Sequence, residues 1–125
     1  MRCNKTVVLF LILSITTQYS CNITEGCDNQ IYARINSGDN KLKVIKFGRD
    51  CGATTKISIQ LSLIKFTDSL PNETGNIFIC DSQNDTSVRA LWVNTSTILV
   101  SYDKDLKIFK KDSLVNNIKI LYSTK

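Results

Sequence analysis

The sequence predicts a mainly β protein, a small antiparallel meander forming a sandwich or a partly closed barrel, preceded by a signal peptide. Apolar residues follow a period of two after residue 21. Clusters of Gly, Asn, Asp and Ser separate the apolar runs. No window of eleven or more residues after the opening segment carries a helical apolar stripe. The 125 residues are enough for one domain and too few for two.

Residues 1–20 have the layout of a secretory signal. Arg2 and Lys5 precede an apolar run from Val7 to Ile15, and polar residues follow it. A membrane-spanning helix needs about 20 apolar residues, so this run is too short. We therefore expect residues 1–20 to direct export, residues 21–26 to form a tether and residues 27–125 to form the single β domain.

Cys21 is the candidate lipidation site. The small residue Ser20 precedes it where the signal would be cleaved, as in bacterial lipoproteins, whose N-terminal Cys is acylated. Acyl chains contribute about 0.8 kcal/mol per buried CH₂, so several of them hold a domain at a membrane without a spanning helix. The expected partner is thus a membrane, through the lipid anchor, and the expected location is the cell envelope; without acylation the chain would be secreted.

Alternation is clearest in the segment 57–63. It places aliphatic side chains on one face and Ser58, Gln60 and Ser62 on the other, which predicts one strand of a one-sided sheet. The apolar phase changes within residues 42–47, which predicts a bulge or a strand buried on both faces.

Turn-forming clusters define the remaining elements. The expected strands span residues 30–36, 41–48, 56–65, 76–80, 88–93, 97–102, 106–109 and 117–123. A short helical turn is expected near Asp112 to Val115.

Three cysteines, Cys27, Cys51 and Cys80, remain in the expected domain. In an oxidising compartment they allow one disulfide and leave one thiol, and their spacing alone does not identify the pair. Cys80 ends the apolar run that begins at Ile77, as is typical of a small buried hydrophobe. The chain has no His and no CxxC, so we expect no metal and no cofactor, and His-dependent nucleophile systems are excluded.

Charge is modest after the signal. Removing residues 1–20 leaves 14 basic and 11 acidic residues, a net charge of +3. Lysines at 41 and 43 and at 107, 110 and 111 could face an anionic lipid or polymer, but lysines that protect strand edges explain them more simply. The export signal and the lack of interleaved aromatic residues predict no nucleic-acid partner.

Two local carboxylate clusters, Asp81 with Asp85 and Asp103 with Asp105, occur in expected turns, where turn formation is their simplest role. Glycosidic hydrolysis would instead need two carboxyl groups roughly 5–10 Å apart in a cleft. N-glycosylation sequons begin at Asn22, Asn72, Asn84 and Asn94.

The segment from Gly48 to Thr55 is the most distinctive part of the chain. Asp50 can accept hydrogen bonds from following amides, Gly52 permits unusual dihedral angles, and the Thr pair restarts a strand. A functional interpretation makes Asp50, Thr54 and Thr55 a small polar pocket beside a disulfide.

This segment resembles a family of short bacterial envelope proteins that carry Asp-Cys-Gly-Ala-Thr-Thr. The resemblance extends from about Cys27 to Tyr122 and includes Asp50 to Thr55, Gln60, Gly75 to Phe78, Trp92 and Leu99 to Tyr102. It implies an extracytoplasmic β domain and no particular activity. Family members also carry a Cys ahead of the first strand, which implies pairing of Cys27 with Cys51. Lys56-Ile57 replaces the Gly-Phe usual in the family, and Cys80 is an additional thiol.

We therefore expect a non-catalytic binding or structural module of the cell envelope, with a protein or glycan partner that the sequence does not identify. One alternative is a carboxylate-based hydrolase acting on an envelope polymer. Another is a secreted viral or host-directed binding glycoprotein, which the sequons would fit.

Overall fold

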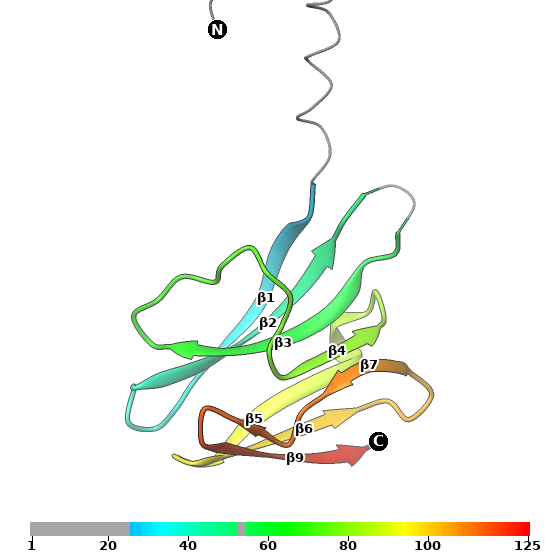
Figure 1. Cartoon of the computed structure of the whole chain (residues 1–125). Coiled ribbons are helices and arrows are strands. Elements are labelled where there is room, and N and C mark those ends of the chain that lie inside the picture. The colour runs from blue at the N-terminus through cyan, green and yellow to red at the C-terminus, as the bar shows by residue number, and fades with distance from the viewer. Residues whose placement is uncertain (1–25, 53–54) are drawn as a thin grey trace, which may run out of the picture.

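Two β-sheets pack face to face in the computed structural model, which describes residues 26–52 and 55–125 (Figure 1). The mainly β sandwich is thereby confirmed; the sheets do not close into a barrel. The expected signal, Cys21 and all of the expected tether except Gly26 lie outside the described residues. In the described part, no helix has the length and apolar character needed to cross a membrane.

The first sheet has five strands in the order β1-β2-β3-β4-β7, and all its pairs are antiparallel. The first four form the expected meander. Their bounds are β1 Asp28–Asn36, β2 Leu42–Asp50, β3 Ser58–Lys65 and β4 Phe78–Asp81, and the edge strand β7 is Lys107–Lys111.

The second sheet has the order β5-β6-β9-β8. Its strands are β5 Val88–Asn94, β6 Thr97–Tyr102, β9 Ile118–Thr124 and β8 Leu114–Val115. The β6–β9 pair is parallel, unlike the rest, so the expectation of a wholly antiparallel arrangement is wrong at this pair. The chain passes from β6 through β7, in the other sheet, before it returns, and short turns fix the direction of consecutive strands only.

The helical turn expected near Asp112 to Val115 is also wrong. Leu114 and Val115 form β8, which pairs antiparallel with the start of β9. The connecting residues Asn116 and Asn117 have φ of 49° and 67°. Asn tolerates this left-handed region, and two such residues match the twist of a tight hairpin. The one helical turn of the described residues is a 3₁₀ turn at Asp85–Ser87.

The core lies between the inner faces of the two sheets. Its largest fully buried members there are aliphatic and aromatic side chains from both sheets: Val44, Ile59, Leu61, Leu63, Ile77, Phe78, Val88, Ile98 and Val100. Trp92 links the sheets, because its indole N–H donates to the backbone oxygen of Ile35 at 2.9 Å.

Strand β2 is buried on both faces, as its change of apolar phase predicted. Val44 contributes to the core between the sheets, whereas the buried side chains of Ile45 and Phe47 alternate to the outer face. The bulge lies in the neighbouring strand β1, between Ile31 and Ala33.

The outer face of β3 is covered too, so the expectation of a one-sided sheet is wrong there. Gln60 is 4% exposed and Ser62 is 5% exposed. The β3–β4 connection, residues 66–77, crosses this face in Figure 1 and hydrogen-bonds to both side chains. Polar side chains thus hold a loop where solvent was expected.

Candidate functional site

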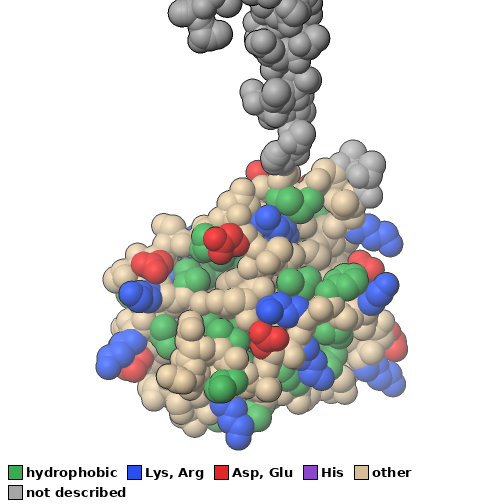
Figure 2. Space-filling view, viewed as in Figure 1, with side chains coloured by type: hydrophobic (Ala, Val, Ile, Leu, Met, Phe, Trp, Pro, Cys, Tyr) green, Lys and Arg blue, Asp and Glu red, His purple; other side chains and the backbone are tan. Residues whose placement is uncertain are grey.

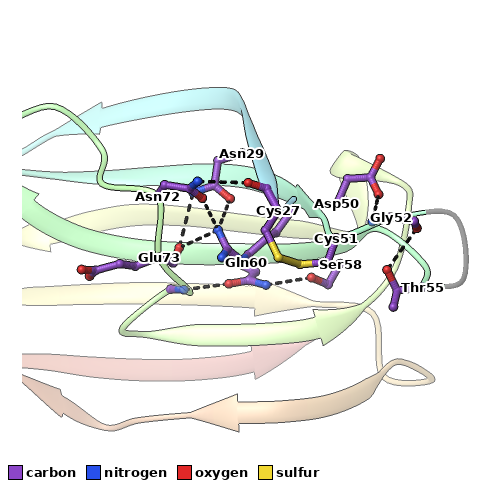
Figure 3. Close-up of a disulfide and its surroundings, with 12 residues drawn as sticks. Cys27, Asn29, Asp50, Cys51, Gly52, Thr55, Ser58, Gln60, Asn72 and Glu73 are labelled. Carbon is purple, nitrogen blue, oxygen red and sulfur yellow. Dashed lines mark hydrogen bonds between the residues drawn. A yellow bond between two sulfur atoms is a disulfide. The ribbon is translucent and has the colours of Figure 1, made fainter. Parts of the chain in front are cut away.

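A disulfide joins Cys27 to Cys51, two residues separated by 24 positions (Figure 3). Cys27 immediately precedes β1 and Cys51 immediately follows β2, and the neighbouring residues Asp28 and Asp50 are register partners. Antiparallel pairing therefore brings the two half-cystines together. This is the pairing that the resemblance implied.

The residues of the predicted polar pocket lie next to this disulfide. The Asp50 carboxylate accepts a hydrogen bond from Gly52 N at 3.1 Å, and the Thr55 hydroxyl donates to Gly52 O at 3.2 Å (Figure 3). Both side chains are exposed and bind the turn that carries them. Thr54 lies outside the described residues, and the described residues enclose no cavity of ligand size. The pocket stays a prediction.

A cluster of hydrogen bonds beside the disulfide holds the β3–β4 connection; we call Asn29, Arg49 and Asn72 the loop clasp. Arg49 Nη1 donates to the side-chain oxygens of Asn29 and Asn72, both at 2.8 Å, and to Glu73 O at 3.3 Å. Asn72 Nδ2 donates to Cys27 O at 3.0 Å, and Asn29 Nδ2 donates to Pro71 O at 3.2 Å. The clasp thus joins the disulfide, two strands and the loop.

Gln60 attaches the loop at a second point. Its side-chain oxygen accepts from Gly75 N at 2.7 Å, and its nitrogen donates to Ser58 Oγ at 2.8 Å. Both ends of this buried amide are therefore satisfied, as a buried polar group requires. Ser62 Oγ also accepts from Asn76 N at 3.2 Å.

Sequence reasoning did not identify the loop clasp. The sequence suggests Asn72 as the start of a sequon and as a turn residue, whereas its amide nitrogen donates to Cys27 O within the fold. A signal was present in the alternation of β2, which puts Arg49 on the same face as Ile45 and Phe47, a face that needed a cover. Gln60, Gly75 and Asn76, which carry part of the resemblance, all serve to hold this cover.

Lys46, which is partly buried, and Cys80, which is fully buried, are titratable groups with a structural role. Lys46 Nζ donates to Asp85 O at 2.7 Å and to Val88 O at 3.0 Å. Desolvation lowers the pKa of Lys46, and the Asp85 carboxylate partly opposes this effect. Cys80 is a free cysteine with no exposed surface, and burial raises the pKa of its thiol to about 11. The prediction of a small buried hydrophobe at Cys80 is confirmed, since a neutral buried thiol is unreactive.

The aspartates of the two clusters noted in the sequence lie at the end of a strand and in turns. Asp85 begins the 3₁₀ turn and Asp81 is the last residue of β4. Asp103 and Asp105 lie in the β6–β7 turn, where Asp103 forms an ion pair with Lys125 at 3.8 Å. Among the described residues, no three His, Cys, Asp or Glu side chains are grouped as a metal ion would require.

Two sequons lie in exposed turns. The side-chain oxygen of Asn84 accepts from Thr86 N and Thr86 Oγ1, and that of Asn94 accepts from Ser96 N and Ser96 Oγ. These contacts give both asparagines a turn-forming role. Asn22 lies outside the described residues.

No protein-family model matches the chain, and neither the curated proteins nor the solved structures contain a match to it.

Proposed function

We propose that the chain is a non-catalytic binding or structural module of the bacterial cell envelope, exported through residues 1–20 and anchored at a membrane through acylated Cys21. The observation that carries the proposal is the Cys27–Cys51 disulfide. Disulfides persist in oxidising compartments and are rare in the cytosol. The first half-cystine, Cys27, lies six positions after Cys21, where an anchored chain would enter the domain.

The hydrogen bonds of the distinctive segment support a structural role for it. Arg49, Asp50 and Thr55 all bind neighbouring backbone or side-chain groups of the same chain. Their hydrogen bonds hold the turn after β2 and the β3–β4 connection in place. A binding surface would then lie elsewhere on the sandwich.

Intact mass spectrometry of the protein from its own host, with and without reduction, tests this proposal. We expect a chain that begins at Cys21, carries an acyl mass and gains the mass of two hydrogen atoms on reduction. The Cys21→Ser chain should lack the acyl mass. Cys3→Ser is the matched control: Cys3 lies in the expected signal, so the mature mass should not change.

Three results would overturn the proposal. A chain that retains Met1 and has five titratable thiols would exclude export. Glycan on Asn72, Asn84 or Asn94 would favour the alternative of a secreted viral or host-directed glycoprotein. Hydrolysis of a purified envelope polymer, lost on substitution of Asp81 or Asp85, would favour the hydrolase.

A further inference from the structure

The outer face of the second sheet carries a row of three leucines, of which Leu91 and Leu121 are exposed and Leu99, between them, is partly buried. Leu91 on β5 is the register partner of Leu99 on β6, and Leu99 is the partner of Leu121 on β9. Register partners share a face, so the three side chains lie side by side across three strands. Leu91 is 42% exposed and Leu121 is 40% exposed. This side of the sheet therefore presents a continuous apolar strip to solvent.

Two further apolar side chains extend the strip. Val93 lies two residues after Leu91, at the register shift between Trp92 and Asn94, and is 53% exposed; Leu114 on β8 is 65% exposed. Leu114 is the register partner of Lys119, which lies on the outer face of β9. We call Leu91, Val93, Leu99, Leu114 and Leu121 the leucine face. Contiguous exposed apolar surface of this kind marks a contact site rather than ordinary solvated surface.

The two charged residues on the outer faces of these strands are both basic. Strand alternation places Arg89 and Lys119 there, both exposed. Just beyond the end of β6, Asp103 forms an ion pair with Lys125. Figure 2, by contrast, shows acidic and basic side chains interspersed over the side of the molecule in view. Apolar side chains flanked by unpaired cations complement a surface that is both apolar and anionic.

An anionic membrane has these two properties. The described domain begins next to β1, an edge strand of the first sheet. Residues 21–26, which would join it to the anchor, span at most about 20 Å when extended. A chain anchored through Cys21 would therefore be held close to the membrane surface.

We propose that the leucine face docks on the anionic membrane surface to which the chain is anchored. This orientation rests on the proposed anchoring function. The apolar strip would contact the acyl boundary while Arg89 and Lys119 contact lipid phosphates, each cation contributing about 1 kcal/mol near an anionic surface.

Vesicle co-sedimentation tests the docking without the anchor. The oxidised chain 22–125 contains every described strand, the whole core and the disulfide, and it lacks Cys21. We expect it to bind vesicles that contain phosphatidylglycerol, to bind pure phosphatidylcholine vesicles at least several-fold less, and to be released by added salt.

Matched variants locate the contact. Leu121→Glu and Leu91→Glu should each lower the partition coefficient about ten-fold, since each removes apolar contact and adds a repelled charge. Phe109→Glu makes the same change of charge at a residue that is 58% exposed on β7, outside the leucine face, and should lower it much less. Circular dichroism confirms that each variant is folded.

Equal losses in all three variants, equal binding to neutral vesicles, or no binding to either vesicle would overturn the docking. So would a dimer in solution that Leu121→Glu dissociates, because the occupant would then be a second copy. Failure of the anchor appears separately, as a missing acyl mass on Cys21, and leaves the vesicle result unaffected.

Discussion

The side-chain amide of Asn76 pairs with the backbone of Leu63 as a neighbouring strand would. Leu63 N donates to Asn76 Oδ1 at 2.7 Å, and Asn76 Nδ2 donates to Leu63 O at 3.0 Å. The Asn76 side chain thereby makes the pair of hydrogen bonds that a neighbouring strand would make to β3, just before the backbone pairing of β3 with β4 begins. The end of the β3–β4 connection is fixed by this pair.

Substitution of Asn76 should therefore destabilise the fold. Asn76→Ala leaves two backbone groups of the buried Leu63 unpaired and should cost about 2 kcal/mol or more in the free energy of unfolding. Asn76→Asp keeps the acceptor for Leu63 N and loses the donor to Leu63 O, so it should also lower the free energy of unfolding. Urea denaturation measures both, with the exposed Gln83→Ala as control; a loss no larger than that of the control would contradict the role.

The glycines of the first sheet should differ in their tolerance of a methyl group. A Cβ on Gly75 would lie 2.5 Å from the backbone oxygen of Leu61, whereas a Cβ on Gly48 would meet the Tyr32 side chain. Because a backbone yields less than a side chain, Gly75→Ala should cost about 2–3 kcal/mol and Gly48→Ala clearly less. Gly38→Ala, with nothing within 4 Å of its Cβ, is the control. Thermal or urea unfolding gives the ranking, and the reverse order would refute it.

Loss of the Cys27–Cys51 disulfide should lower the free energy of unfolding by roughly 3.5 kcal/mol, if the loop-closure entropy of the unfolded chain dominates. Urea midpoints with and without reductant measure this effect. The double substitution Cys27→Ala/Cys51→Ala should unfold like the reduced protein and should not respond to reductant. A response of the double variant would show that the reductant acts elsewhere.

Stability should fall at alkaline pH because of Cys80. Its thiol has a pKa of 9.0 in the unfolded chain, and burial raises this pKa to about 11 in the fold. Between these values the unfolded chain releases a proton that the folded chain keeps, so rising pH favours unfolding. Well below pH 9 the Cys80 thiol is neutral in both the folded and the unfolded chain, so its contribution to the free energy of unfolding does not change with pH.

Cys80→Ala isolates this contribution. The variant leaves a small cavity, so it should be less stable than the parent at pH 8. The gap in free energy of unfolding between parent and variant should shrink from pH 9 to pH 11. A gap that stays constant over this range would show that Cys80 does not titrate as inferred. Lys46, whose pKa is lowered, remains in both proteins and cancels in the difference.

The strand segments were predictable because local alternation reports burial directly. All eight expected strands occur, with boundaries that differ by at most a few residues, and the short β8 was missed. Double burial of β2 was also visible, since two apolar phases overlap within residues 42–47. The loop clasp was not predictable, because its three side chains come from segments 20 or more positions apart.

Period-two patterning, turn chemistry and cysteine content follow from neighbouring residues, and they suffice for a β domain that contains a disulfide. The partner of each strand and the cover of each face depend on contacts between distant segments. For that reason only the folded chain shows that β6 and β9 run parallel. It also shows that Gln60 is buried under the β3–β4 connection while Leu91 and Leu121 lie exposed on the outer face of the second sheet. Alternation gives each strand two faces, and the packing of the two sheets decides which of them meets water.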